Sequence, residues 1–376
     1  MQCNYVTGCM DVMLDYSEDG LLMRFFYPTR TSQNEKTKYV PWLDDDAYVE
    51  GMAKAIYIRP FVLYFLRWWF AGSKVYSPLR YGEKVNTDTK LKCIVLSHGF
   101  ASTRFFNSVI CNELASRGYL VVALEHRDNS AGYTYYYANK EDAKNDNRTA
   151  LEIKRVELGV GHYETRNAQV NRRARECSKV LDFLINLNNG TVPYNVMDDL
   201  KGDHDFHLED LVGKLDLDSV TMAGHSFGGA TALLALSKRK EFRQGILLDP
   251  WMFPIKDEEG LVESVTQPLL FINTQTFHIS SNVEAMKQLL TSEDRHMYTL
   301  LSTTHEYQSD SVLVFGSWLN WFMKKLDPHL ALQLNNALAL KFLKQYTNHP
   351  ETIEDCEKLL EAEKTHVVSG VTKPWA

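Results

Sequence analysis

Short runs of apolar, β-branched residues alternate along the chain with longer stretches in which apolar residues recur at helical spacing. This alternation is typical of an α/β fold, in which helices cover both faces of a mostly parallel central sheet. We expect one domain over residues 1–376, because no internal repeat, linker or low-complexity tract interrupts the pattern. The expected strands are 11–16 and 22–27, paired as an antiparallel hairpin, then 93–96, 120–124, 220–223, 245–248, 269–272 and 297–300. The expected helices are 107–117, 165–188, 228–240, 282–290 and 311–325, with a polar helical tail from about 330 to 363.

The clearest helical period lies between Arg166 and Leu187. We interpret this stretch as a crossover helix that packs on the sheet through one apolar face. Its Arg172-Arg173-Ala174-Arg175 segment is expected to lie on the solvated face. The apolar positions are Val170, Ala174, Cys177, Val180, Leu181 and Leu184.

Composition and charge exclude several classes of function. Hydrophobic residues make up 44% of the chain, which is ample for a large core. The net charge is −7 and no basic block occurs, so we expect no nucleic-acid partner. The six cysteines show no C-x-x-C spacing, which argues against a disulfide framework. The acidic and His-rich segment 203–207 lies in a polar loop, and we expect neither a metal nor a cofactor.

The N-terminal region suggests where the protein resides. The first 25 residues carry several carboxylates and lack a charged-then-apolar signal pattern. We therefore expect a cytoplasmic protein. The sequence leaves open whether Cys3 is acylated and which oligomeric state the protein adopts.

The segment Gly224-His225-Ser226-Phe227-Gly228 carries the strongest chemical signal. It lies between an apolar strand-like run at 220–223 and an apolar helix-forming run at 229–236. G-x-S-x-G in that context is typical of a nucleophile elbow. Ser226 would stand at a helix N-terminus, where free N–H groups and the helix dipole favour developing negative charge. The alternative is a Gly-rich turn that happens to hold a serine.

A nucleophilic serine needs a histidine base, and the base needs a carboxylate that orients it. Downstream of Ser226, only His305 directly follows an expected strand, and it is therefore the expected base. Asp249 is the expected acid, because it ends a buried strand and the loop after the next strand carries no carboxylate. Glu306 and Asp310 are too close to His305 in sequence to orient its ring.

Acyl transfer also requires backbone N–H donors for the oxyanion. The residue after the nucleophile, Phe227, is the first expected donor. The second should come from the loop 97–100 after an expected strand, with Phe100 as the donor and His98 shaping the loop.

Five segments combine into one pattern: Ser97-His98-Gly99, Glu125-His126-Arg127-Asp128, Gly224–Gly229, Asp249-Pro250-Trp251-Met252 and Phe271-Ile272-Asn273. Taken together, they resemble the platelet-activating factor acetylhydrolases of the plasma and type II intracellular kind. The resemblance implies an α/β-hydrolase fold and a calcium-independent serine esterase. Its substrates would be phospholipids with short or oxidised sn-2 acyl chains.

An aromatic stretch at 56–70 suggests contact with a lipid surface. It is too short, and too interrupted by Arg59, Pro60 and Arg67, to span a bilayer. Members of the resembled family use an exposed apolar helix in this region to reach lipid. The membrane-contact candidates are Phe65, Trp68 and Trp69. The alternative is a buried lid or core helix.

Two other functions stay open at this point. One is a carboxylesterase or lipase that acts on neutral esters, and the other is a non-catalytic lipid-binding protein on the same fold.

Overall fold

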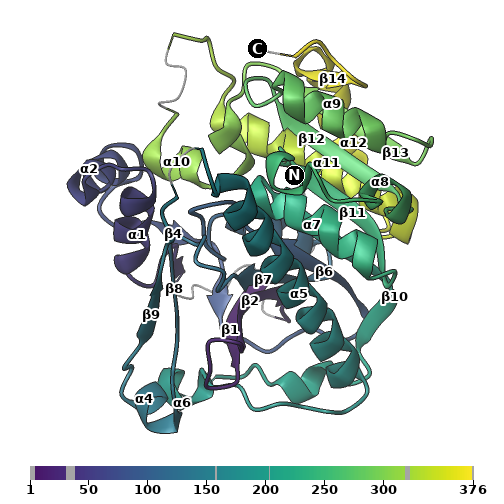
Figure 1. Cartoon of the computed structure of the whole chain (residues 1–376). Helices are drawn as coiled ribbons and strands as arrows, with labels where there is room; N and C mark the ends of the chain where they lie inside the picture. The colour runs from purple at the N-terminus through teal and green to yellow at the C-terminus, as the bar shows by residue number, and fades with distance from the viewer. Residues whose placement is uncertain (1–4, 31–38, 157–158, 203, 318–321, 375–376) are drawn as a thin grey trace.

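A ten-stranded sheet forms the centre of the structure, a computed structural model that describes residues 5–30, 39–156, 159–202, 204–317 and 322–374. Its parallel centre comprises β6 (Leu91–Ser97), β7 (Tyr119–Glu125), β10 (Leu215–His225), β11 (Phe242–Leu248), β12 (Leu269–Thr274) and β13 (Arg295–Leu300). Its flanks are β1 (Thr7–Leu14), β2 (Leu21–Pro28), β5 (Arg80–Tyr81) and β14 (Val367–Ser369). The strand order is β14-β13-β12-β11-β10-β6-β7-β2-β1-β5 (Figure 1). All eight expected strands are confirmed, including the antiparallel pairing of β1 with β2.

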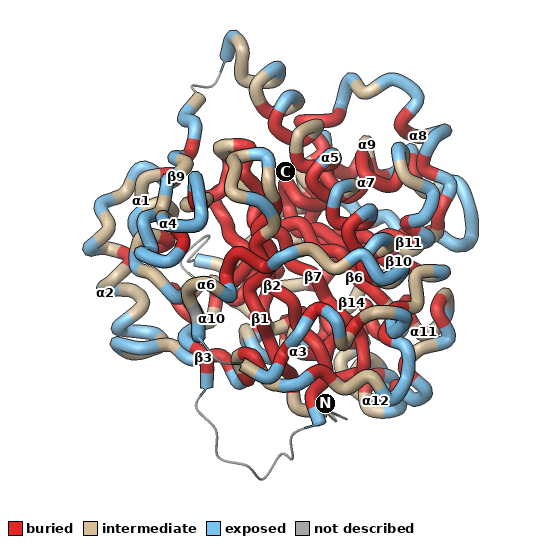
Figure 2. The backbone as a smooth tube through the Cα atoms, turned by 90° about the horizontal axis from the view of Figure 1, so that it is seen from below, coloured by how far each residue is buried: buried red, intermediate tan, exposed pale blue. Residues whose placement is uncertain are grey.

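Helices cover both faces of this sheet. One layer comprises α5 (His162–Asn188), α7 (Phe227–Lys238) and α9 (Ser280–Leu289), and the other comprises α3 (Ser108–Ser116), α11 (Pro328–Thr347) and α12 (Glu354–Ala362). Along β6, Cys93 and Val95 pack in the first layer, whereas Ile94 and Leu96 pack in the second. Strands β2 and β7 are buried along their whole length (Figure 2). Burial on both faces explains why β7 is an almost continuous apolar run rather than an alternating one.

The expected helix within 56–70 is α2 (Pro60–Ala71), which packs on α1 (Ala47–Ala55) and on α10 (Ser311–Phe315). These three helices lie together beside the sheet (Figure 1). Their shared core includes Trp42, Leu63, Phe106 and Phe315. The remaining short elements are β3 (Val40–Pro41), β4 (Tyr76–Ser77), β8 (Tyr133–Tyr136), β9 (Thr149–Glu152), α4 (Lys140–Lys144), α6 (Asp198–Lys201) and α8 (Leu261–Ser264).

Two expectations for the C-terminal part are wrong. The helix expected over 311–325 ends at Phe315, because Gly316 adopts a positive φ of 75° that a right-handed helix cannot continue through. Residues 318–321 of that range lie outside the described residues. The tail is not polar either, because α11 buries Leu334, Ala337 and Leu338 against the sheet layer, and the chain then adds β14 to the sheet edge.

The solvated-face interpretation of the arginine segment is also wrong at its centre. Arg175 is exposed and Arg172 is half-buried beside Glu18. Arg173, however, is fully buried and pairs with Asp128 over 2.9 Å. The crossover interpretation of α5 is confirmed, and the expectation of one domain over 1–376 stays a prediction.

Candidate active site

Ser226 occupies a strained turn between β10 and α7. Its φ and ψ are 57° and −116°, a backbone conformation that costs energy for a residue with a side chain. A Cβ on Gly224 would overlap the carbonyl oxygen of Gly228, and a Cβ on Gly228 would overlap that of Ser97. The two glycines therefore allow the backbone to fold closely around Ser226, as the elbow pattern predicted.

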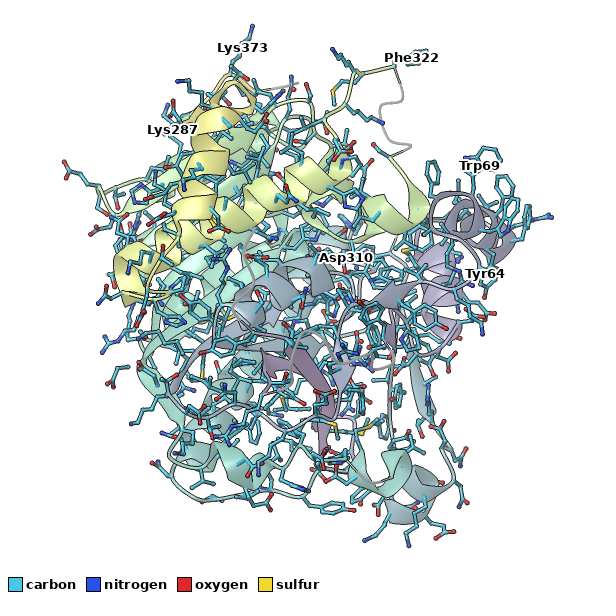
Figure 3. All side chains as sticks on the ribbon, turned by 180° about the vertical axis from the view of Figure 1, so that it is seen from behind. Tyr64, Trp69, Lys287, Asp310, Phe322 and Lys373 are labelled. Carbon is cyan, nitrogen blue, oxygen red and sulfur yellow. The ribbon has the colours of Figure 1, made fainter. Side chains whose placement is uncertain are left out.

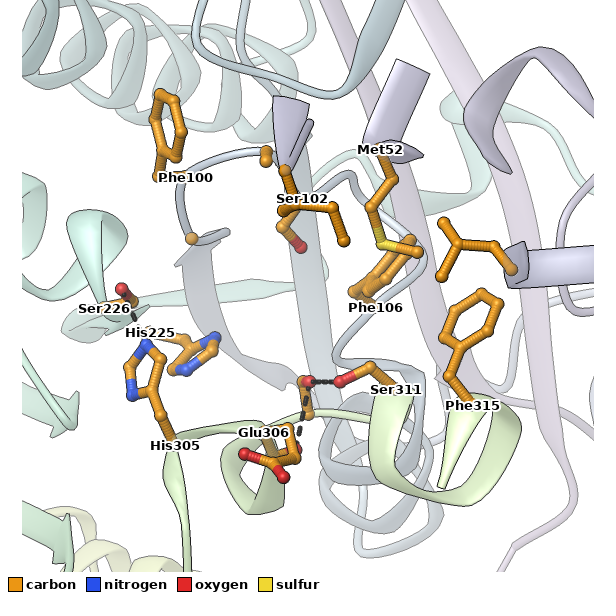
Figure 4. Close-up of a pocket in the computed structure, with 15 residues that line it drawn as sticks. Met52, Phe100, Ser102, Phe106, His225, Ser226, His305, Glu306, Ser311 and Phe315 are labelled. Atoms are coloured by element: carbon orange, nitrogen blue, oxygen red, sulfur yellow. Dashed lines mark hydrogen bonds between the residues drawn. The ribbon is translucent and has the colours of Figure 1, made fainter. Parts of the chain in front are cut away.

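The structure brings Ser226, His305 and Asp249 together at the carboxyl edge of the sheet. His305 Nε2 lies 3.0 Å from Ser226 Oγ (Figure 4), and His305 Nδ1 lies 3.0 Å from Asp249 Oδ2. Asp249 follows β11 and accepts hydrogen bonds from the backbone N–H and the hydroxyl of Thr274. A carboxylate on Nδ1 keeps the proton there, so Nε2 is left to accept the proton of the serine hydroxyl.

Two aromatic neighbours of His305 were not predicted. Phe277 stacks on the imidazole with ring centroids 3.8 Å apart, and this contact restricts the plane of the ring. His225 lies on another side, with centroids 4.9 Å apart. Burial lowers the pKa of His225 well below its usual value, and the nearby His305 and His98 lower it further. His225 therefore stays neutral beside the base.

The expected oxyanion donors lie on two segments next to Ser226. Among the described residues, neither the Phe100 N–H nor the Phe227 N–H has a hydrogen-bond acceptor. The loop before Phe100 is held from behind, because Arg173 Nη1 donates to the carbonyl of His98 over 2.6 Å. His98 Nε2 accepts the backbone N–H of His126, so its Nδ1 carries the proton and donates to the carbonyl of Gly99 over 2.8 Å.

A second serine, histidine and carboxylate chain lies behind the same loop. Ser97 Oγ is 2.7 Å from His126 Nε2, and His126 Nδ1 is 2.5 Å from Glu176 Oε2. Ser97 and His126 are fully buried, so a substrate cannot reach the Ser97 hydroxyl. This chain of hydrogen bonds joins β6, β7 and α5 beneath the loop. Sequence reasoning missed it because Glu176 lies on a helix far from both partners in sequence.

A cavity of about 190 Å³, here called the Ser226 pocket, opens at the serine. Its apolar wall comes from α1, α2, α10 and the segment before α3, and includes Met52, Leu63, Phe106 and Phe315 (Figure 4). An apolar cavity with a few polar groups at one end is suited to an acyl or alkyl chain whose ester lies at Ser226.

Helix α2 contributes to one wall of this pocket and presents its other face to solvent. Leu63 is buried and lines the pocket, whereas Phe65, Trp68 and Trp69 are 54%, 57% and 67% exposed. Figure 3 shows Trp69 projecting outward from α2. The alternative of a buried lid or core helix therefore does not describe the outer face of this helix. Within the described residues, no helix is both long and apolar enough to cross a bilayer.

Comparison with known proteins gives concordant matches over nearly the whole length. Residues 1–367 match the family model described as platelet-activating factor acetylhydrolase, isoform II. The platelet-activating factor acetylhydrolase of Canis lupus familiaris is 32% identical over 371 residues, which are 98% of this chain and 81% of that protein. The protein of the same name from Gallus gallus is 32% identical over 378 residues, covering 97% of this chain and 87% of that protein.

A solved structure supports the fold. The ferulic acid esterase from Streptomyces cinnamoneus superposes with a TM-score of 0.63 at 17% identity, covering 97% of this chain and 96% of that one. The expected α/β-hydrolase fold is confirmed.

Proposed function

The chain belongs to the platelet-activating factor acetylhydrolase family, and we propose that Ser226, His305 and Asp249 are its catalytic triad. As a member of this family it is a serine ester hydrolase that acts on phospholipids. The observation that carries the triad proposal is the pair of 3.0 Å contacts that His305 makes with Ser226 and Asp249.

The proposed reaction starts with attack of Ser226 Oγ on the sn-2 ester carbonyl while His305 Nε2 takes the hydroxyl proton. The buried Asp249 carboxylate stabilises the imidazolium that forms. The N–H groups of Phe100 and Phe227 stabilise the oxyanion of the tetrahedral intermediate. His305 then protonates the departing glycerol oxygen, and water hydrolyses the acyl-serine by the same steps in reverse order.

We further propose a preference for short or oxidised sn-2 acyl groups. The limited volume of the Ser226 pocket, about 190 Å³, supports this, because a short acyl group needs little space beside the serine. Every step uses groups of the chain itself, so we expect turnover without added calcium.

Turnover of phosphatidylcholines with graded sn-2 chain lengths, with and without a chelator, tests this function. Activity should fall with chain length, survive the chelator and vanish in Ser226→Ala, and an organophosphate should label Ser226 alone. Preferential turnover of triglyceride would favour the neutral-ester alternative. Lipid binding without any turnover would favour a non-catalytic protein, and labelling of another serine would overturn the choice of nucleophile.

We also propose that the outer face of α2 docks on a membrane or lipid surface through Phe65, Trp68 and Trp69. The exposure of these rings supports it, as does the position of the helix over the Ser226 pocket. Aromatic side chains favour the membrane–water interface. A lipid could then pass from that surface to the serine along the inner face of α2. A cytoplasmic location with peripheral membrane contact remains our expectation.

A further inference from the structure

A second cavity, of about 320 Å³, shares Phe100 as a lining residue with the Ser226 pocket. We call it the Arg166 pocket. Trp251 also lines the second cavity. Its backbone N–H donates to the carbonyl of Ser226 over 2.9 Å. The two pockets therefore meet beside the expected oxyanion site.

The Arg166 pocket is basic although the chain carries a net charge of −7. Its described lining includes Lys154, Arg155 and Arg166 together with His162, and no aspartate or glutamate. Lys154 and Arg155 are exposed at the rim. Arg155 stacks on the Tyr57 ring at 4.6 Å from its centroid, which holds its guanidinium near the entrance.

Arg166 differs from the rim cations because it is buried and, among the described residues, has no ion-pair partner. It is only 4% exposed, and its guanidinium lies 4.3 Å from the centroid of the Phe100 ring. Within the part of the chain that the structure describes, its one hydrogen bond runs from Nη1 to the neutral amide oxygen of Gln169 over 2.8 Å, and Nε has no partner. No carboxylate lies within ion-pair distance among the described residues.

The Asp128 carboxylate attracts the charge of Arg166, but Arg173 and Ser130 already engage that carboxylate. Burial also lowers the pKa of Arg166, which marks how poorly its charge is solvated. A buried cation is costly unless an anion compensates it. The unused hydrogen-bonding capacity of the guanidinium is thus available to an anionic ligand, and its planar geometry suits an oxyanion such as phosphate.

We propose that the Arg166 pocket binds the phosphodiester of the glycerophospholipid headgroup while the sn-2 ester lies at Ser226. The inference rests on the proposed function and adds the group that orients the substrate. In a glycerophospholipid the phosphate is carried on the carbon next to the one that bears the sn-2 oxygen. With the ester at Ser226, the phosphate must therefore lie close by but outside the apolar pocket. Arg166 meets this requirement, because it packs on Phe100, which lines both pockets, and itself lines only the second one.

The test compares two acetyl esters of matched chain length, one with a phosphodiester headgroup and one neutral acetylglycerol. Arg166→Gln should lower the ratio of kcat/KM for the phosphodiester ester to that for the neutral ester by about tenfold to a hundredfold, since charged hydrogen bonds are lost. Arg166→Lys should recover part of the ratio. Arg175→Gln is the matched control, because Arg175 is exposed on the same helix, and the ratio should not change.

An equal loss for both esters would overturn the proposal, because Arg166 would then only support Phe100. An unchanged ratio would also overturn it. If the wild-type protein cleaves the neutral ester and not the phosphodiester ester, the proposed function fails instead.

Inhibition of neutral-ester hydrolysis gives a second, independent measurement. Glycerophosphocholine should inhibit the wild type and inhibit Arg166→Gln more weakly. If inorganic phosphate inhibits the wild type and glycerophosphocholine does not, the pocket is a general anion site and the headgroup assignment is overturned.

Discussion

Arg173 on α5 donates from Nη1 to the carbonyl oxygen of His98 over 2.6 Å, although its sequence context suggested an exposed side chain. Its Nη2 also lies 3.4 Å from the carbonyl oxygen of Gly99. That carbonyl and the Phe100 N–H belong to one planar trans peptide, so they point in opposite directions. Holding the carbonyl from behind therefore fixes the direction of the N–H that is proposed to face the oxyanion.

Arg173→Met should affect both stability and rate. The variant leaves Asp128 buried without its cation, so the free energy of unfolding should fall by about 3–5 kcal/mol in urea denaturation. In the folded fraction, kcat should fall by up to about 10²-fold with little change in KM, because the Phe100 N–H acts on the transition state. Arg175→Met, on the exposed face of the same helix, is the control. An unchanged kcat in folded Arg173→Met would show that the loop is positioned without Arg173.

Asp249→Asn should keep the shape and position of the side chain, but its amide NH2 donates where the carboxylate accepted and so favours the wrong tautomer of His305. We expect kcat to fall by about 10⁴-fold, as in serine proteases with the corresponding change, and the melting temperature to change little. Stopped assays with a soluble acetyl ester measure the rate. The acid is wrongly chosen if Asp249→Asn keeps near-full activity while Glu306→Gln loses it.

His225 gives a prediction for the dependence of stability on pH. Burial lowers its pKa in the folded state well below the usual value of 6.5, so the unfolded chain binds a proton that the folded chain does not. The contribution of His225 to stability is therefore present above pH 6.5 and is lost as the pH falls below it. Between pH 7 and 5.5 this should cost about 1 kcal/mol.

His225→Gln removes that titrating group. Urea denaturation at the two pH values should show a smaller loss in the variant than in the wild type, by about 1 kcal/mol. Equal losses in both proteins would mean that His225 is protonated in the folded state despite its burial.

The sequence predicted the parts of the site that follow strand ends. Ser226 and Asp249 end buried apolar runs, and His305 follows another, so their approximate places could be read from the order of strands. Side chains that support the site from a distance left no such signal. Arg173 is one of three arginines within four positions, and only the packing of α5 on the loop after β6 decides which one is buried. Phe277 similarly becomes a neighbour of His305 only through the folding of the loop after β12.

Helix α2 provides the final prediction, since Trp68 and Trp69 are 57% and 67% exposed beside a pocket that must receive lipid. If these rings enter a bilayer interface, each contributes on the order of 1.5–3 kcal/mol to binding. Changing both to serine should weaken partitioning into phosphatidylcholine vesicles by about tenfold or more. Hydrolysis of a dispersed, water-soluble ester should change little, because neither ring lines the Ser226 pocket.

Tyr194→Ser is a matched control, since that ring is 51% exposed on a segment distant in sequence, and its loss should leave partitioning unchanged. A double variant that melts well below the wild type, with unaltered partitioning of the folded fraction, would reject membrane docking and give these two tryptophans a role in the packing of α2 against α1 and α10.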